Sequence, residues 1–332
     1  VLAGNPTFWR GEPAIDTYRI VPSDDPNPET DLVRLSSLES STVDGTAQTT
    51  FPDDRYSFIA LNLADPGQPV AGLDGNNARQ AQPPHPILGD VRVRQAIAAA
   101  LDYDALLAAA YDGATYRTGA YVPPAAAWAH DSALAPYAYD PTLASQLLDE
   151  AGWRDENGDG VRTRDGASLQ LTLLTNNDSV PRMAIAELTA QQLTAIGFDV
   201  RRSALPFEAM SQQILAQAFD LAVLSWDNLG ADPGALPFWH ARQDEPGRGF
   251  NFVSFQDAEV DQWLDAARTM AGCDPDARAT LYRQVQARIH DAVPYVIIGG
   301  PQAAWQHSTA WTGITPGAWG ADDNIEQWSR QQ

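Results

Sequence analysis

The feature that most constrains the fold of this chain is an alternation between two hydrophobic periods. Short segments with apolar residues at every second position, or in brief continuous runs, are typical of β-strands. They lie at residues 14–21, 56–63, 169–174, 198–202, 221–226 and 294–298. Apolar residues recur at helical spacing over residues 90–101, 140–152, 181–197, 207–216, 257–270 and 275–292. This order predicts an α/β fold with a mainly parallel sheet, followed by an irregular tail from Gln302.

Two of the predicted helices carry clear start signals. Asp90 precedes a segment in which Val93 and Ile97 fall on one face, and an aspartate is a favoured N-cap. Asp140 is followed by Pro141, and proline suits the first position of a helix. Both helices are therefore expected to begin at these residues.

The charge of the chain excludes several classes of partner. It carries 21 Lys+Arg, all of them arginine, against 43 Asp+Glu, for a formal net charge of −22. Such a surface repels phosphate backbones and anionic lipid, so nucleic acid is not an expected partner. Without any lysine, the chain cannot complete a phosphate-binding loop of the Gly-x-x-x-x-Gly-Lys type.

Cellular location is only indirectly indicated. No apolar run approaches the ~20 residues of a membrane span, and no basic region followed by an apolar core marks a leader. The first residues, Val1-Leu2-Ala3-Gly4, indicate that a leader was removed or that the chain is a fragment. Cys273 is the only cysteine, which excludes an internal disulfide and a cysteine-based metal site.

One loop has the oxygen ligands of a calcium site. Asp155, Asn157 and Asp159 alternate and are followed by Gly160, as in a calcium-binding loop. The twelfth position is Gly166, where the bidentate glutamate should stand. No cofactor is required by the sequence. A solvated turn is the first interpretation of this loop, and a structural calcium site is the alternative.

Several segments, in order along the chain, resemble extracellular solute-binding proteins of family 5, the peptide/nickel group that serves ATP-driven importers. They are Asn5-Pro6-Thr7-Phe8-Trp9, residues 90–103, Pro123-Pro124 with Trp128, Tyr139-Asp140-Pro141, residues 155–166, Ile196-Gly197-Phe198, residues 226–233 and Glu259-Val260-Asp261. Each segment is weakly specific, but the ordered set covers nearly the whole chain.

The resemblance implies a two-lobed fold of the type II periplasmic-binding-protein class with one lobe incomplete. Residues 1–89 and 295–332 are expected to form part of the discontinuous first lobe, and residues 90–294 an essentially complete second lobe. The resemblance further implies that the amino-terminal part of the first lobe is not included in this sequence.

The function that the resemblance implies is solute capture outside the cytoplasm, without chemistry. The protein would lie in the periplasm or be anchored at the cell surface, close around its ligand, and be recognised by the membrane subunits of the importer. A neutral oligosaccharide or oligopeptide is expected rather than a dipeptide. In peptide-binding members an aspartate holds the ligand's amino group where this chain has Leu229, and the alignment puts Asn176 where dipeptide binders use an arginine. Arg182, six residues further on, is not expected to replace it.

The candidate ligand-binding residues are amides, aromatic rings and one carboxylate near predicted strand ends. Ligands of open α/β sheets bind beyond the carboxyl ends of the strands, and amide groups beside aromatic faces suit a neutral solute. These candidates are Asn176, Asn177, Trp226, Asp227, Asn228, Trp239, Asn251 and Trp128. For each, a turn or core role is the structural alternative.

Two other functions remain open at this point. Forty-three acids make chance carboxylate pairs common, so an acidic glycoside hydrolase is an alternative that a count of acids cannot establish. A sensor or interaction module with the same fold but no transport role is the other. Nickel is not an expected ligand, because His240 is the only histidine near the predicted site.

Overall fold

The computed structural model describes residues 2–3, 17–18, 32–35, 45–227, 232–233, 236–315 and 324–330. Of the strand predicted at residues 14–21, only β2 (Thr17–Tyr18) lies within this part of the chain, where it pairs with β1 (Leu2–Ala3). Asn228 and Leu229 lie outside the described residues.

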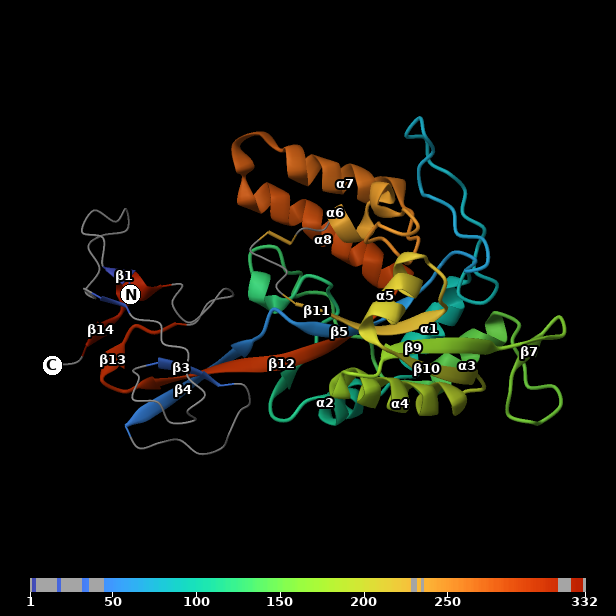
Figure 1. The fold of residues 1–332 in the computed structure, drawn as a ribbon, viewed down its shortest axis with the longest axis horizontal. Coiled ribbons are helices and arrows are strands. Elements are labelled where there is room, and N and C mark those ends of the chain that lie inside the picture. The colour runs from blue at the N-terminus through green and yellow to red at the C-terminus, as the bar shows by residue number, and fades with distance from the viewer. Residues whose placement is uncertain are drawn as a thin grey trace.

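A mixed sheet forms the centre of the molecule, with strand order β10-β9-β11-β5-β12-β3 (Figure 1). The strands are β10 (Asp199–Leu205), β9 (Gln170–Asn176), β11 (Leu221–Trp226), β5 (Tyr56–Leu61), β12 (Tyr295–Ser308) and β3 (Leu32–Leu35). Strands β4 (Thr46–Pro52) and β6 (Thr115–Tyr116) also pair with β12.

The prediction of a mainly parallel sheet is wrong. Strand β9 is parallel to β10 and β11, but β5 is antiparallel to both β11 and β12. Helices connect the strands of the parallel part, as parallel pairing requires. Helix α8 (Pro275–Ala292) is instead followed by Val293, whose backbone lies in the left-handed region. The chain then turns directly into β12. The two antiparallel strands lie beside each other although more than two hundred residues separate them.

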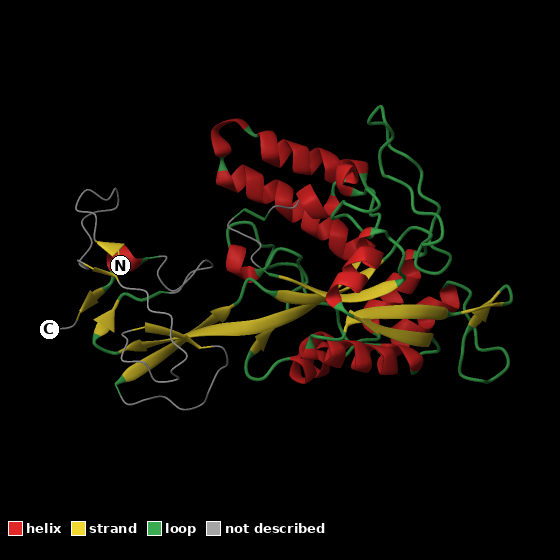
Figure 2. Ribbon diagram, viewed as in Figure 1, coloured by secondary structure: helices red, strands yellow, loops and turns green. Residues whose placement is uncertain are grey.

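Helices cover both faces of the sheet, and alternate residues of each strand face the two layers (Figure 2). In β5, Ile59 and Leu61 pack with α1 (Val91–Ala99), α2 (Tyr103–Ala110), α3 (Pro141–Glu150) and α4 (Val180–Thr194). Phe58 and Ala60 pack on the other side with α5 (Phe207–Leu215), α7 (Ala258–Thr269) and α8. Because alternate residues of β5 are buried under the helices of opposite faces, every residue of this strand is buried.

The predicted helix starts at Asp90 and Asp140 are confirmed. The Asp90 carboxylate accepts a hydrogen bond from the Arg92 amide at 3.0 Å, and that of Asp140 from the Leu143 amide at 2.9 Å. The short elements are α6 (Leu236–Trp239), η1 (Pro124–Ala126), η2 (Ala241–Gln243), η3 (Ala271–Cys273), η4 (Ile325–Gln327), and the pairs β7 (Thr163–Arg164) with β8 (Ala167–Ser168) and β13 (Trp311–Thr312) with β14 (Ser329–Arg330).

The tail is not irregular from Gln302, because β12 continues to Ser308 between β3 and β4. Its outer half extends away from the helical layers toward the described parts of both chain ends (Figure 1). Residues 302–308 lack apolar alternation, and pairing with two neighbours through backbone groups is what fixes them as a strand.

At Gly299 and Gly300, β12 passes from its pairing with β5 in the α/β body to its pairing with β4 outside it, and we call this point the crossing of β12. The pairing with β5 shifts register after Ile297, and Gly299 has φ +120°. Beside the crossing, the Asp53 amide donates to the Pro301 carbonyl at 3.2 Å. Two chain segments, residues 52–56 and 299–302, thus run side by side between the α/β body and the outer strands. The predicted lobe boundaries at residues 89 and 295 stay a prediction, but β5 and the start of β12 join the sheet of the middle region.

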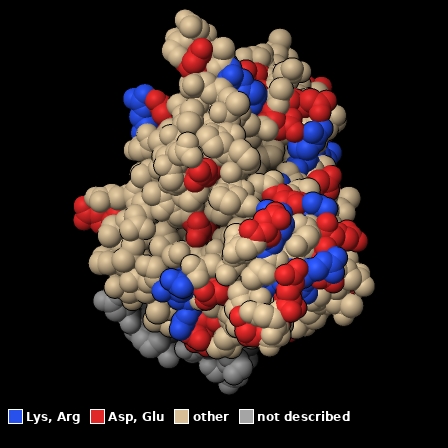
Figure 3. Space-filling view, turned by 90° about the vertical axis from the view of Figure 1, so that its right-hand side faces the viewer, with Lys and Arg blue, Asp and Glu red and all other residues tan. Residues whose placement is uncertain are grey.

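On the face of the molecule shown in Figure 3, charges of both signs are mixed rather than segregated. Figure 3 shows acidic and arginine side chains interspersed on one face of the molecule, among a larger area of other residues. Among the described helices, none is both long and apolar enough to cross a membrane.

Candidate ligand site

Strands β9, β10 and β11 end at a common edge of the sheet. They are parallel, and Asn176, the last residue of β9, lies opposite Leu205, the last residue of β10. β5 begins at the same edge, where Tyr56 pairs with Trp226. Because ligands of open α/β sheets bind at the carboxyl ends of the strands, this edge is the candidate site.

On the α2/α4 face of the sheet, the edge carries a connected set of polar side chains. The Ser57 hydroxyl lies 2.6 Å from the Tyr111 hydroxyl and 2.9 Å from that of Ser225. The Arg182 Nε donates to Ser225 at 3.4 Å, and its Nη1 donates to the Asn176 side-chain oxygen at 3.0 Å. Side chains from β5, β9, β11 and α4, together with Tyr111 at the end of α2, therefore meet in one hydrogen-bond network.

Arg182 is the residue that sequence reasoning set aside and the fold brings into the site. Asn176 ends β9 and α4 begins at Val180, so Arg182 lies in the first turn of the helix, directly above the strand end. Burial lowers the pKa of its guanidinium, and nearby acids offset part of this effect. The sequence contained a signal for this placement of Arg182. The first turn of a helix that follows a parallel strand after a short loop lies at the carboxyl edge of the sheet.

On the opposite face, Trp226 joins a series of aromatic rings that runs from the core to the surface. Its ring centroid lies 5.8 Å from that of buried Phe58, 4.5 Å from Phe238 and 6.3 Å from Phe250. Phe250 is 46% exposed, whereas Phe58 is fully buried. Trp226 thus has one side against the core and forms part of the edge with the other.

The remaining predicted residues at this edge are exposed or lie elsewhere. Asn177 and Asp227 are exposed at the ends of β9 and β11. Trp128 packs edge-on against Tyr282 of α8, with ring centroids 5.7 Å apart, and the Arg278 guanidinium lies 5.3 Å from its ring. These contacts place one side of the Trp128 ring beside α8.

Two predicted ligand residues belong to the interior, and this placement corrects the prediction. Trp239 is fully buried against Tyr121 and Tyr295. Asn251 is also fully buried, and its amide bonds the backbone of Phe255 in both directions, at 2.7 Å and 3.0 Å. An amide that ties down a loop has no free surface or hydrogen-bonding capacity for a solute.

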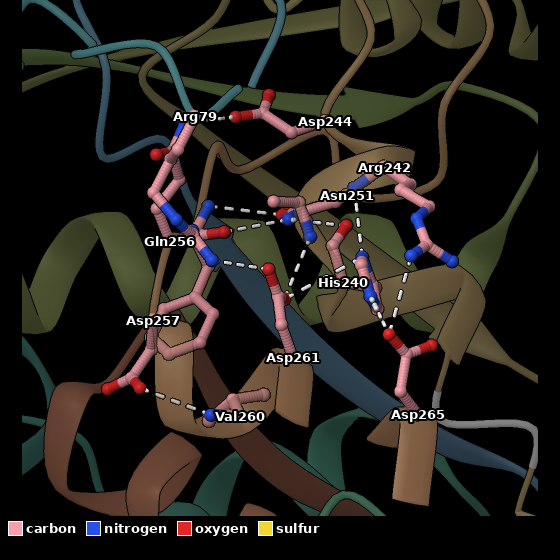
Figure 4. Close-up of polar contacts among 12 residues, drawn as sticks. Arg79, His240, Arg242, Asp244, Asn251, Gln256, Asp257, Val260, Asp261 and Asp265 are labelled. Carbon is pink, nitrogen blue, oxygen red and sulfur yellow. Dashed lines mark hydrogen bonds and ion pairs between the residues drawn. The ribbon is translucent and has the colours of Figure 1, made fainter. Parts of the chain in front are cut away.

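Asn251 lies beside a buried polar cluster that ties loops together around η2 (Figure 4). At its centre, the Asp244 carboxylate accepts hydrogen bonds from Gln217 at 2.8 Å, Ser254 and Gln256 at 3.1 Å, and Gln82 at 3.2 Å. Burial nevertheless raises the pKa of Asp244 above its usual value, and the hydrogen bonds from Gln256, Gln217 and Ser254 offset part of that rise. The cluster is a structural feature that holds the long loop after β5.

Asp244 makes the stability of the protein depend on pH. A carboxyl whose pKa is raised by folding stabilises the native state most below its unfolded pKa, near 3.8, and loses that contribution as pH rises through the folded value. The difference in unfolding free energy between wild type and Asp244→Asn, which cannot ionise, is therefore expected to decrease from about pH 3 toward neutrality. Urea unfolding of both proteins across this range measures it, and a difference that rises with pH would contradict it.

The candidate calcium loop is held by its own hydrogen bonds. Asp155 accepts from the amides of Gly158 and Gly160, at 2.8 and 3.0 Å, and Asp159 accepts from Val161 and from the Asn157 side chain. Backbone amides thus occupy these oxygens as in a solvated turn, and within the described chain no group of three or more His, Cys, Asp or Glu could hold a metal ion. Calcium stays a prediction.

Comparison with known proteins agrees with this architecture. The oligopeptide-binding protein AppA of Bacillus subtilis is 27% identical over 307 residues, which cover 90% of this chain and 53% of that protein. Protein XP55 of Streptomyces lividans is 25% identical, covering 94% and 54%, and di/tripeptide-binding protein 2 of Pseudomonas aeruginosa is 26% identical, covering 90% and 52%. The chain spans about half the length of the curated relatives it matches.

Solved structures share the fold over a similar extent. HbpA2 from Haemophilus parasuis matches with a TM-score of 0.73 at 18% identity, over 99% of this chain and 61% of that one. AppA from Bacillus subtilis in complex with a nonapeptide gives 0.65 at 24% identity, over 87% and 53%. NikZ from Campylobacter jejuni in complex with Ni(L-His) gives 0.61 at 21% identity, over 86% and 54%.

The family is identified by a direct match. Residues 1–245 match the family model described as bacterial extracellular solute-binding proteins, family 5, middle part. The resemblance of residues 90–103 and 155–166 to this group is therefore confirmed. The chain belongs to family 5 of the bacterial extracellular solute-binding proteins.

Proposed function

We propose that this chain is part of a solute-capture protein that binds a peptide outside the cytoplasm and delivers it to the membrane subunits of an ATP-driven importer. The observation that carries this proposal is the two-sided edge of the sheet, with Asn176, Arg182 and Ser225 on one face and Trp226 on the other. Amide and hydroxyl groups suit the peptide backbone, and the aromatic rings suit its side chains. AppA and the Pseudomonas relative carry peptide-binding names, which supports the same class.

The two lobes can move relative to each other about the two connecting segments, residues 52–56 and 299–302. A ligand that contacts both lobes stabilises the closed state because the open state lacks half of those contacts. We infer that the α/β body described above is the second lobe and that the strands beyond the crossing belong to the first. No bond is made or broken, and membership of a solute-binding family removes the glycoside hydrolase alternative.

Other solutes have less support at this site. None of the relatives and structures described above is named for an oligosaccharide, so the oligosaccharide that the sequence left open as a ligand is not retained. NikZ binds a nickel complex, Ni(L-His). In the described part of this chain, however, the histidines bond to residues away from the edge: His85 contacts Asp220, for example, and His290 contacts Ala135.

Peptide binding is expected to raise the melting temperature of the intact protein. A peptide at a hundred times its dissociation constant adds ~2.7 kcal/mol of stability. Trp226→Ala, which removes a ring from the edge, is expected to weaken binding about tenfold. Trp263→Ala is the matched control, because Trp263 lies on α7 with its ring 5.6 Å from the Arg288 guanidinium, and it should leave affinity unchanged. If no member of a broad peptide library shifts the melting temperature, the proposed function is wrong.

A further inference from the structure

Two adjacent glycines, as at the crossing of β12, are typical of a flexible joint, but here both are closely packed. A Cβ on Gly299 would overlap the carbonyl oxygen of Tyr116, and a Cβ on Gly300 would overlap that of Arg55. Glycine is the residue that permits such close approach of one backbone to another. The crossing is therefore a junction at which three chain segments are in backbone contact.

The third of these segments is β6, which comes from the α/β body. It pairs with β12 at Gly300 and Pro301. Next along β12, the Gln302 amide donates to the Ala114 carbonyl at 2.8 Å, and the Gln302 side chain donates to the Thr115 carbonyl at 3.3 Å. Strand β12 is thus bonded to the α/β body as far as Gln302, on the outer side of the crossing.

The side chain of Tyr116 joins β6 to the other connecting segment. Its hydroxyl donates to the Arg55 carbonyl at 2.9 Å, and the residue is only 8% exposed. Burial, followed by the charge of Asp53, raises the pKa of this hydroxyl far above its usual value, so it remains a donor throughout the neutral range. Through this hydroxyl and the pairing of β6, both connecting segments are bonded to the same strand.

Strand β6 is itself anchored to the α/β body on both sides. Before it, the hydroxyl of Tyr111 at the end of α2 lies 2.6 Å from that of Ser57 in β5. After it, the Arg117 Nη2 donates to the Tyr137 carbonyl at 2.7 Å, and the Arg117 guanidinium lies 4.9 Å from the Tyr103 ring. Because β6 is held at each end, the parts of the connecting segments that are bonded to it move with the α/β body.

Bending of the lobes is then left to the positions just outside this junction. Residues 53–55 lie between β4 and β5 and belong to neither strand. The Asp54 amide donates to the side chain of the preceding residue, Asp53, at 2.9 Å. On β12, the bonds to the segment that contains β6 end at Gln302. The least restrained links are therefore residues 53–54 and the backbone beyond Gln302.

We propose that Tyr116 is a positioning residue for lobe movement: together with β6 it restrains the crossing of β12, so that the lobes bend at residues 53–54 and beyond Gln302 and not at the two glycines. This inference rests on the proposed function, in which the lobes close around a peptide, and it narrows the part of the connecting segments that moves. A restrained joint leaves fewer open arrangements of the lobes and so lowers the conformational entropy that closure costs.

The distance between two spin labels, one on each side of the crossing, tests the proposal in the intact protein without ligand. Thr50→Cys on β4 and Arg201→Cys on β10 supply exposed label sites in a Cys273→Ser background. Tyr116→Phe removes only the hydroxyl and is expected to widen the distribution of label distances about twofold. Hydrogen exchange of the Gln302 amide should become about 2- to 10-fold faster, because β6 holds β12 less firmly.

Tyr121→Phe is the matched control. Tyr121 lies in the loop that follows β6, is buried, and has no hydrogen-bond partner for its hydroxyl within the described part of the chain, so both readouts should keep their wild-type values. Circular dichroism at the assay temperature excludes misfolding of either variant. An unchanged distance distribution in Tyr116→Phe, or a wild-type Gln302 amide that exchanges as fast as that of Asp54, would overturn the inference.

A library of synthetic tetrapeptides, added to the labelled proteins, separates this inference from the proposed function. A peptide that closes the lobes shifts the label distance of wild type, and Tyr116→Phe should need about threefold more of it for half of the shift. Equal requirements in the two proteins would overturn the inference but leave peptide binding intact. If no peptide shifts the distance in wild type, the proposed function is contradicted, whereas the restraint by Tyr116 is still judged from the ligand-free distributions.

Discussion

Replacing Gly299 with alanine is expected to lower the free energy of unfolding by about 4 kcal/mol, through backbone strain and steric overlap together. Gly299 has φ +120°, a region that residues with a Cβ rarely adopt, and a Cβ there would lie 2.1 Å from the Tyr116 carbonyl oxygen. Because this oxygen belongs to the backbone, it cannot rotate away from the added Cβ as the end of a flexible side chain could. Urea denaturation of the intact protein measures the change.

Gly158→Ala is the control for this prediction. Gly158 also has a positive φ, +75°, but nothing lies within 4 Å of the Cβ it would gain. It should cost only about 1 kcal/mol, the conformational part of the effect. If both variants lose the same free energy of unfolding, close packing at the crossing of β12 is not the main cause of the loss in Gly299→Ala.

Asp244→Ala is expected to lower the free energy of unfolding by about 3 kcal/mol or more, because it leaves several buried donors without an acceptor. The side chains that lose their bond, Gln217, Gln82, Ser254 and Gln256, come from three separate segments of the chain, because Ser254 and Gln256 share one loop. The same urea experiment measures the loss, and differential hydrogen exchange should rise in the loop around Gln82.

Asp104→Ala provides the comparison. Its side chain is 78% exposed and faces Arg117 at 3.5 Å, and such surface pairs contribute about 0–1 kcal/mol. A loss for Asp244→Ala no larger than that for Asp104→Ala would show that the buried acceptors are not what stabilises this region.

Much of the secondary structure was predictable from the sequence because it depends on local patterns of hydrophobic residues and helix caps. The strands at 221–226 and 56–61 and the helix at 275–292 follow from period and caps, and the structure has them at or within two residues of the predicted bounds. Residues 302–308 were missed because a strand supported on both sides by backbone pairing needs no apolar alternation.

The candidate site was only partly predictable, for a related reason. Asn176 and Trp226 end strands, so their position at the edge follows from the local pattern. Trp239 and Asn251 have the same residue chemistry but lie inside, because packing of Tyr121, Phe255 and the loop backbone closes over them. Residue type alone does not distinguish an aromatic ring at the surface from one in the core.

By itself, the sequence determined the α/β class, the helix starts and the family, because these depend on spacing and on short segments in a fixed order. The tertiary structure alone decided the antiparallel placement of β5 and β12 and the meeting of Ser57, Tyr111, Arg182 and Ser225. These features join residues far apart along the chain. Hydrophobic periodicity reports which side of an element is buried, but it does not report which distant element buries it.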